Sequence, residues 1–390
     1  IERLPEPVRD RIEDEVDELL EFVQDRRPPR FMLVGRRGSG KSTLVNAIFE
    51  NQVQEVGSVD SQTGEAQWFE YESEGEKIEI LDTRGTQEGT DPDEQDEASS
   101  SVQSLKQEIQ SKCPDVIMFM IKAKEVDSAV EGDIEILEDL HNFIEDQKER
   151  KVAVVGIITQ CDELDPPYVR ELPTGNEEKK ANIESAKQTL TRHLSSNNVV
   201  GRHLVEVVPT AAFVRFRADG SIDEDHDYRW NIEHLTELLL DELPKKAKLD
   251  FARLAKVRRF QRKIARRIVD TCSAAAGGIG AQPIPIADLP CITSLQAAMV
   301  LCVAYVSGRK LSMGAAKEYL TAVGGNAGVA FGLREGVRAV AKFVPGWGNA
   351  VSGGVAAAGT EVIGRGAIAY FIDDESVDDV REDIKSAEEA

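Results

Sequence analysis

The chain has 390 residues, 41% of them hydrophobic, which suffices for roughly two or three domains with ordinary cores and excludes disordered and collagen-like architectures. Its 47 basic and 70 acidic side chains give a net charge of −23, so the molecule as a whole repels nucleic acid and anionic lipid, and any such partner needs a local basic patch. Five scattered cysteines without a C-x-x-C pair disfavour a disulfide scaffold or a zinc site and fit a reducing cytosol.

The N-terminal segment, residues 1–29, is predicted to contain an amphipathic helix. Over residues 4–23, apolar side chains recur at steps of three and four among many carboxylates, which gives one apolar stripe that needs a partner surface. The acidic start does not resemble a basic-then-apolar leader, so we expect a protein that is not secreted.

Residues 30–244 are predicted to form an α/β domain. Short apolar runs alternate there with longer polar segments of helical period, which is typical of a sheet covered by helices. The expected strands are 31–34, 67–71, 78–81, 116–121, 152–159 and 205–208. The expected helices are 41–49, 97–110, 129–147, 177–194 and 232–239.

A phosphate-binding loop is predicted over residues 35–42, whose sequence GRRGSGKS fits G-x-x-x-x-G-K-[ST] between the first strand and the first helix. Such a loop curls its backbone N–H groups around phosphate oxygens, and the helix N-terminus adds a favourable dipole. Lys41 would bridge the β- and γ-phosphates, and the Ser42 hydroxyl would ligate Mg²⁺. A glycine-rich turn that binds nothing is the alternative, which the matching flanks disfavour. The expected phosphate-binding residues are Gly35, Gly38, Ser39, Gly40, Lys41, Ser42 and Thr43.

A second motif follows strand 78–81, where residues 82–85 read D-x-x-G. This arrangement sets the carboxylate of Asp82 near Mg²⁺ and the amide of Gly85 near the γ-phosphate. An aspartate after a strand is common by itself, so the motif gains meaning only from its place after the phosphate loop.

Two further motifs would recognise the base. Asp162, in the stretch TQCD that follows an apolar run, can accept two hydrogen bonds from the N1–H and 2-amino groups of guanine. Adenine lacks that pair of donors, so the contact would select GTP over ATP. The stretch PTAA at 209–212 would present a backbone N–H to guanine O6. The expected residues at the base are Thr159, Gln160, Asp162, Thr210 and Ala211.

With these four motifs in this order, residues 30–244 resemble the Era-like GTPases of the translation-factor-related (TRAFAC) class of P-loop proteins. The resemblance implies a Ras-like G domain with a mostly parallel six-stranded sheet, which hydrolyses GTP to GDP with Mg²⁺. It also implies that Thr63 is the switch threonine that contacts Mg²⁺ and the γ-phosphate, although a polar loop residue is the alternative. The implied Mg²⁺ ligands are Ser42, Thr63 and Asp82.

The chain departs from the family pattern at two positions. Gln160 stands where the family usually has a lysine along the purine ring, and Thr86 stands where many GTPases carry the glutamine that orients the attacking water. We therefore expect a modest affinity for guanine and slow intrinsic hydrolysis, with the chemistry dependent on a partner or on a nucleotide-dependent dimer.

Arginines near the phosphates are candidates for positive charge in the transition state, as an arginine finger supplies it. Arg36 and Arg37 lie inside the phosphate loop, and Arg84 lies beside the switch glycine. The alternative is that they face solvent or pair with acids. The expected catalytic residues are Lys41, Thr63, Arg37 and Arg84.

Histidines and cysteines suggest no second site. The five histidines show no metal-ligand spacing and favour surface or packing roles: His141, His193, His203, His226 and His234. Cys161 lies within the guanine motif, where a partly buried, unreactive thiol is the favoured interpretation.

Residues 245–267 carry eleven lysines and arginines against one acid, Asp250. They are predicted to form one continuous helix with apolar side chains along one side. It can pair with the acidic N-terminal helix or the acidic tail, lie on anionic lipid, or bind RNA. An intramolecular partner is favoured because acids of opposite sign are present in the same chain, and RNA is the weakest choice because no aromatic platform accompanies the cations.

The remainder resembles the uncharacterised helical domain found C-terminal to many bacterial Era-like GTPases, and more loosely the immunity-related GTPases, whose N- and C-terminal helices form one lobe. The stretches that carry the resemblance are 284–290, 295–300, 343–349 and 361–365. That family is associated with membranes. Residues 289–308 have the roughly 20 residues needed to cross a bilayer, but a buried helix of a bundle is favoured because the run contains Pro290 and several polar residues.

The expected domains are an N-terminal helix at 1–29, a GTPase domain at 30–244, a helical domain at 245–373 and an acidic tail at 374–390. The N- and C-terminal helices together would form an all-α lobe. The expected function is a nucleotide-dependent switch whose helical lobe contacts a membrane surface or a protein partner. A non-hydrolysing scaffold or membrane-anchoring module is the alternative. We expect a cytoplasmic protein, peripheral at the inner face of the membrane if lipid is the partner, and nucleic acid is disfavoured.

Overall fold

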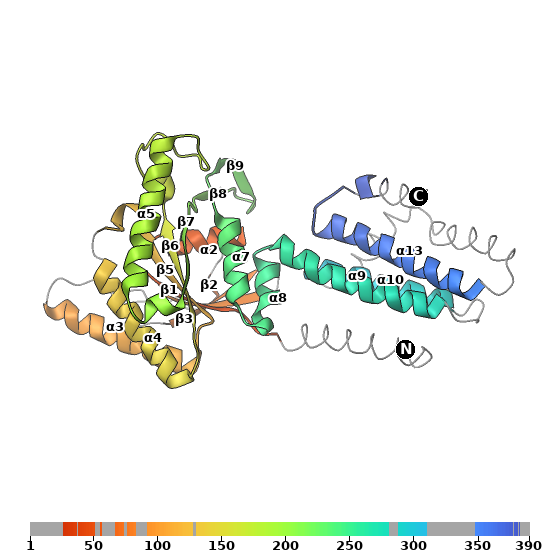
Figure 1. Ribbon diagram of the computed structural model, residues 1–390, viewed down its shortest axis with the longest axis horizontal. Helices are drawn as coiled ribbons and strands as arrows, with labels where there is room; N and C mark the ends of the chain where they lie inside the picture. The colour runs from red at the N-terminus through yellow and green to blue at the C-terminus, as the bar shows by residue number, and fades with distance from the viewer. Residues whose placement is uncertain are drawn as a thin grey trace. The chain divides into compact units, whose positions relative to one another are not determined.

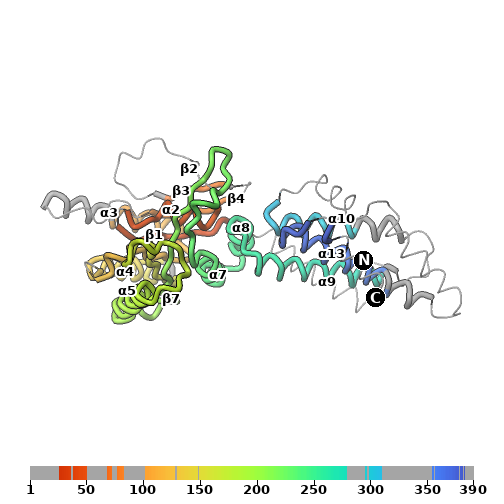
Figure 2. The backbone as a smooth tube through the Cα atoms, turned by 90° about the horizontal axis from the view of Figure 1, so that it is seen from above, coloured from red at the N-terminus to blue at the C-terminus, as the bar shows by residue number. Residues whose placement is uncertain are grey.

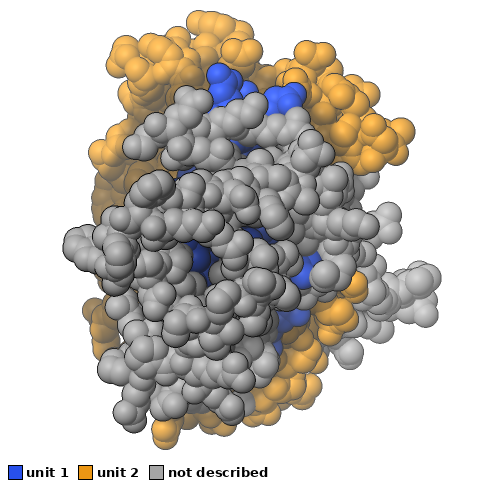
Figure 3. Space-filling model, turned by 90° about the vertical axis from the view of Figure 1, so that its right-hand side faces the viewer, with its two compact units in different colours: residues 1–26, 256–390 blue, residues 27–255 orange. Residues whose placement is uncertain are grey.

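The computed structural model describes residues 26–36, 38–50, 55–56, 67–73, 76–82, 92–127, 130–280, 288–309, 348–376, 378–380 and 382. The chain divides into two compact units, which Figure 3 colours separately. One comprises residues 27–255, and the other comprises residues 1–26 together with 256–390. The expected N-terminal helix lies outside the described residues.

The first unit is built on a sheet in the order β2-β3-β4-β1-β5-β6-β7. Its strands are β1 Arg30–Val34, β2 Glu55–Val56, β3 Gln67–Ser73, β4 Glu76–Asp82, β5 Val116–Lys122, β6 Ala153–Thr159 and β7 Leu204–Pro209. The pairs from β4 through β1, β5 and β6 to β7 are parallel, whereas β2, β3 and β4 pair antiparallel. The mostly parallel sheet of six expected strands is confirmed, and the short β2 extends it at one edge.

Helices cover both faces of this sheet, as Figure 1 shows, with α3, α4 and α5 on one face and α2, α7 and α8 on the other. Their bounds are α2 Lys41–Phe49, α3 Pro92–Ser111, α4 Val130–Lys148, α5 Glu177–Ser196, α6 Val200–His203, α7 Ile232–Glu242 and α8 Lys245–Leu254. Because both faces are covered, the inner strand β5 is apolar and buried from Val116 to Ile121. This arrangement is the Ras-like P-loop fold that we expected.

A two-stranded hairpin was not expected from the sequence. It comprises β8 Val214–Phe216 and β9 Ile222–Asp227, which pair antiparallel around a turn at Gly220 with φ of +84°. The hairpin is mostly exposed or half-buried, and β9 reads IDEDHD. Its residues therefore lack the apolar alternation by which strands are recognised.

The expected continuous helix over 245–267 is wrong, because the structure interrupts it between α8 and α9, which spans Arg258–Gly280. Lys256 adopts a left-handed conformation with φ of +48°, which an α-helix does not accommodate. The aromatic ring of Phe251 in α8 packs against Phe31 and Phe49, with ring centroids 5.3 and 6.3 Å away. Burial of Phe251 thus attaches α8 to the sheet unit.

The second unit contains α9, α10 Asp288–Val306 and α13 Gly348–Phe371, which lie side by side in Figures 1 and 2. At Gly364 in α13, a Cβ atom would stand 2.5 Å from the side chain of Val269 in α9, so the absent side chain permits this close approach. Gln296 and Thr360 share a buried hydrogen bond of 3.1 Å between α10 and α13.

The cations of α9 pair with the acidic C-terminal stretch. Arg258 binds Asp374 and Arg262 binds Asp373, each with an N to O distance of 2.5 Å. The favoured intramolecular pairing of the basic segment with the acidic tail region is confirmed for these two pairs.

In the part of the chain that the structure describes, no helix combines the length and the apolar character that a membrane span requires.

Candidate functional site

The phosphate loop leaves β1 and enters α2 with the backbone conformation that its glycines allow. Gly38 and Gly40 adopt φ of +77° and +86°, which side chains disfavour. Gly35 passes so close to β5 that a Cβ atom there would meet the carbonyl oxygen of Met120 at 2.5 Å. The ammonium of Lys41 crosses the loop and donates to the carbonyl oxygen of Gly35 at 2.7 Å.

The loop fits a phosphate group by an observation independent of its motif. The hydroxyl oxygen of Ser39 is buried and has no hydrogen-bond partner among the residues that the structure places. A buried polar atom without a partner costs about 1–3 kcal/mol, and a phosphate oxygen is an acceptor that would satisfy it. Ser39 therefore supports a ligand in the curl of the loop.

Asp82, at the end of β4, joins the phosphate loop from the neighbouring strand. Its carboxylate is buried and lies 3.5 Å from the ammonium of Lys41, while Ser42 is exposed in the first turn of α2. A buried carboxylate and a hydroxyl are oxygen donors of the kind that Mg²⁺ prefers, so these residues fit the expected ion. The other residues discussed for the phosphate and Mg²⁺ part of the site lie outside the described residues: Arg37, Thr63, Arg84, Gly85 and Thr86.

Arg36 is engaged by a carboxylate of α4. Its Nε lies 3.0 Å from Oδ2 of Asp133, and its Nη2 donates to Oδ1 at 3.1 Å. Burial raises the pKa of Asp133, and the hydrogen bond from Arg36 opposes that rise. Arg36 therefore pairs with an acid, which was one of the expected alternatives to a catalytic role for the loop arginines.

The guanine motif is tied to the phosphate loop by two side chains. Thr159, the last residue of β6, donates its hydroxyl to the carbonyl oxygen of Ser39 at 2.8 Å. Gln160 adopts φ of +58°, and its amide nitrogen donates to the carbonyl oxygen of Gly38 at 3.2 Å. The structure thus brings together the predicted base-binding and phosphate-binding segments.

Asp162 lies in the short 3₁₀ turn η2 Cys161–Glu163 and is buried, and burial raises the pKa of its carboxyl group. Beside it, Cys161 is completely buried, which raises the pKa of its thiol to about 12 and makes it unreactive at neutral pH. The carboxylate of Asp162 therefore has restricted access to water.

Two lysines that the motifs do not contain also belong to the site. Lys179 of α5 is completely buried and donates to the carbonyl oxygens of Asp162, at 2.7 Å, and Leu164. Lys122 ends β5 beside the phosphate loop, where a Cβ atom on Gly38 would stand 3.6 Å from its nitrogen. In sequence Lys179 is one of several lysines in a polar helix, so no local signal reveals its position.

The segment at 209–212 lies beside the guanine motif, since the N–H of Cys161 donates to the carbonyl oxygen of Thr210 at 3.1 Å. Thr210 is buried and bonds back to Ile158. Within the stretch that we expected to present an N–H to guanine O6, the N–H of Ala211 donates to the carbonyl oxygen of Trp230 at 3.2 Å.

Residues 30–158 match the family described as "50S ribosome-binding GTPase", and residues 247–388 match the family described as "Domain of unknown function (DUF697)". GTPase Der of Chromobacterium violaceum is 32% identical over 106 residues, which are 27% of this chain and 22% of that protein. The Der protein of Hyphomonas neptunium is 29% identical over 103 residues, 26% of this chain and 20% of that protein. The chain thus spans about a fifth of the length of the curated relatives it matches.

Among solved structures, Era in complex with MgGDPNP and nucleotides of 16S ribosomal RNA is 23% identical, with a TM-score of 0.35 over 64% of this chain and 67% of that one. Toc33 from Arabidopsis thaliana in complex with Mg²⁺ and GMPPNP is 15% identical, with a TM-score of 0.36 over 64% of this chain and 94% of that one.

The fold, the phosphate loop and the match over residues 30–158 give the first unit the architecture of a Ras-like P-loop GTPase. Since the matching GTPase family is described as ribosome-binding, the expectation that nucleic acid is a disfavoured partner is not supported.

Proposed function

We propose that this protein is an Era-like GTPase that binds guanine nucleotide and hydrolyses GTP to GDP with Mg²⁺. The observation that carries the proposal is the joined site, in which Thr159 and Gln160 hold the guanine motif against the carbonyl oxygens of Ser39 and Gly38. One bound molecule would then touch the phosphate loop with one end and Asp162 with the other.

The chain's own groups supply the binding and positioning. Lys41, which now donates to Gly35, would exchange that carbonyl for the β- and γ-phosphates, and the loop amides would hold the phosphate oxygens. Ser42, Thr63 and Asp82 would hold Mg²⁺, which when bound neutralises charge on the phosphates. Asp162 would accept the two donors of guanine.

Arg37 and Arg84 are the proposed sources of further positive charge during hydrolysis, because Arg36 is engaged by Asp133. We expect Arg37→Ala or Arg84→Ala to lower the single-turnover rate by at least about tenfold, since such arginines contribute far more than that in related chemistry. Arg36→Ala is the matched control and should leave the rate nearly unchanged. Unchanged rates in both test variants would exclude this role.

The nucleotide assignment is tested by calorimetric titration of the full chain with GDP and ADP, together with single-turnover GTP hydrolysis. We expect tighter binding of GDP and a measurable rate that Lys41→Ala abolishes, whereas Lys180→Ala, an exposed lysine on α5, has no effect. Equal affinities for the two nucleotides would refute the guanine assignment, and hydrolysis that survives Lys41→Ala would refute the enzyme.

We further propose that the helical lobe is the output of the switch, through an anionic membrane surface or a protein partner at the inner face of the membrane. Exposed Lys263 and Arg266 on α9 support it, as does the pairing of two other α9 cations with acids that a partner could replace. Co-sedimentation with anionic vesicles, with GDP or a GTP analogue, tests this, and Lys263→Glu with Arg266→Glu should abolish binding. We expect the unmodified chain to bind anionic vesicles and not neutral ones. Absence of binding to anionic vesicles would exclude a membrane as the partner.

A non-hydrolysing nucleotide-binding scaffold is the second candidate, favoured by Gln160 in place of the usual lysine. Hydrolysis measured with and without vesicles, and at two protein concentrations, separates it from an enzyme that needs a membrane or a nucleotide-dependent dimer. Absence of turnover under all of these conditions, with tight GDP binding, would favour the scaffold.

A further inference from the structure

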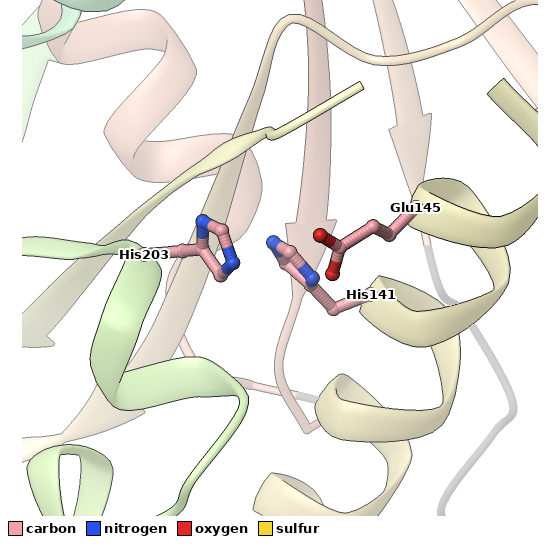
Figure 4. Close-up of side chains that lie close together, drawn as sticks. All are labelled: His141, Glu145 and His203. Carbon is pink, nitrogen blue, oxygen red and sulfur yellow. The ribbon is translucent and has the colours of Figure 1, made fainter. Parts of the chain in front are cut away.

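Three side chains distant in sequence meet on the first unit, away from the nucleotide motifs. His141 and Glu145 lie one turn apart on α4, and His203 is the last residue of α6. One potential ligand atom from each residue lies within 4.8 Å of the others. Figure 4 shows His141 between the ring of His203 and the carboxylate of Glu145. The three residues form the His-Glu-His cluster.

His141 has a defined tautomer in its neutral form. It is completely buried, and its Nε2 lies 3.0 Å from the carbonyl oxygen of Val152. Since a carbonyl oxygen can only accept, Nε2 carries the hydrogen, and Nδ1 is left with its lone pair. That Nδ1 is buried and has no hydrogen-bond partner in the described part of the chain. Metal-binding histidines characteristically donate their second ring nitrogen to a carbonyl in this way.

His203 is also positioned to act as a metal ligand. Its ring stacks on that of His141, with centroids 4.2 Å apart and planes inclined by 26°. The neutral imidazole is the form that binds metals. The carboxylate of Glu145 supplies negative charge to the same space.

We propose that the His-Glu-His cluster binds a divalent transition metal of the zinc class. Two imidazole nitrogens and one carboxylate oxygen are a set that zinc accepts, with water as the fourth ligand. Since zinc bonds to such atoms are about 2.0–2.2 Å long, the ligand atoms would lie roughly 3.3 Å apart, which requires only small side-chain adjustments. Mg²⁺ prefers oxygen ligands and would not compete.

The cluster is separate from the nucleotide site. Val152 directly precedes β6 and His203 directly precedes β7, so the cluster lies at the edge where these parallel strands begin. The phosphate loop and Thr159 lie where the strands end. A bound metal would clamp α4 to α6 and restrain the entry to β7. This proposal stands independently of guanine binding, because none of its ligands is a predicted nucleotide-binding residue.

The test is a titration of the full chain with Zn²⁺ in excess Mg²⁺ and GDP, followed by competition with a chromophoric chelator. We expect one zinc ion per chain, bound at least about tenfold more weakly by His203→Ala and by Glu145→Gln. His226→Ala, which removes an exposed histidine of the hairpin, is the matched control and should bind like the unmodified chain. Zinc should also raise the melting temperature of the unmodified chain but not that of His203→Ala.

The atoms that bind the metal can be identified separately by absorption spectroscopy. Co²⁺ in the same site should give the visible absorption of a nitrogen- and oxygen-bound ion. The near-isosteric Glu145→Gln keeps the proposal falsifiable if His203→Ala fails to fold. Unchanged zinc affinity in folded Glu145→Gln and His203→Ala would overturn it. A sulfur-to-cobalt charge-transfer band would likewise overturn it, because it would assign the metal to cysteines.

Discussion

The side-chain amide of Gln160 donates to the main-chain oxygen of Gly38 at 3.2 Å, and so joins the base-binding loop to the phosphate loop. At this position the resemblance leads one to expect a lysine. The amide retains a tether to the phosphate loop but not the positive charge. This chain therefore differs from the family pattern in having no positive charge at this position.

We expect Gln160→Ala to weaken GDP binding by up to about tenfold, because one hydrogen bond that orders the site is lost. Gln160→Lys should bind GDP at least as tightly as the unmodified chain, since a lysine can make the same donation and adds charge. Calorimetric titration measures both, with Gln188→Ala on the exposed side of α5 as the control. Unchanged affinity in Gln160→Ala would show that the tether contributes nothing to binding.

GDP binding should depend on pH through Asp162. Burial raises the pKa of this carboxyl group above its ordinary value of 3.8. The two guanine donors need the ionised carboxylate, so affinity is complete well above the raised pKa and falls as the pH drops through it. The loss should begin at a higher pH than for an exposed aspartate.

Titrations at a series of pH values, with circular dichroism to check folding at each, measure this dependence. Asp162→Asn does not titrate, so it should bind GDP weakly and without the decline. A decline of equal size in Asp162→Asn would assign the pH dependence to another group.

Lys179 should contribute to the stability of the guanine loop. Lys179→Met keeps most of the volume but leaves the carbonyl oxygens of Asp162 and Leu164 without their buried donor. The expected loss in the free energy of unfolding is about 1–3 kcal/mol, together with weaker GDP binding. Urea denaturation measures the first quantity. Lys180→Met, at the neighbouring exposed position, should change neither, and equal effects at both positions would contradict the assignment.

The helical unit offers a test of its packing on a single helix. Gly364→Ala would place a Cβ atom 2.5 Å from Val269, so α9 and α13 would have to separate, and we expect a clear loss of thermal stability. At Gly359, on the same helix, nothing lies within 4 Å of the added atom. Gly359→Ala should therefore stabilise by up to about 1 kcal/mol through helix propensity. Equal effects of the two substitutions would refute the close packing at Gly364.

The sequence predicted those features that depend on local pattern. The apolar runs of β1, β5 and β6 are long and lie between polar helices, and the phosphate loop has a fixed spacing, so their place in the fold could be inferred. The break at Lys256 could not, because it is decided by the burial of Phe251 against Phe31 and Phe49 on distant elements.

Contacts between side chains that are distant in sequence could not be predicted either. Lys179 looks like any lysine of a polar helix, and strand β6 and helix α5 separate the histidines of α4 and α6 along the chain. Their proximity follows from the parallel order of β6 and β7, which brings the segments that precede these strands to one edge. The spacing of these histidines along the chain does not indicate that they lie close together.

The attachment of α8 to the sheet sets where the first unit can be cut from the rest of the chain. A fragment that stops at Pro244 would leave the rings of Phe31 and Phe49 without the aromatic cover that Phe251 provides. A fragment that continues through Ala255 retains this cover and ends where the compact unit itself ends. The basic residues of α8 are therefore part of what an isolated nucleotide-binding fragment must keep.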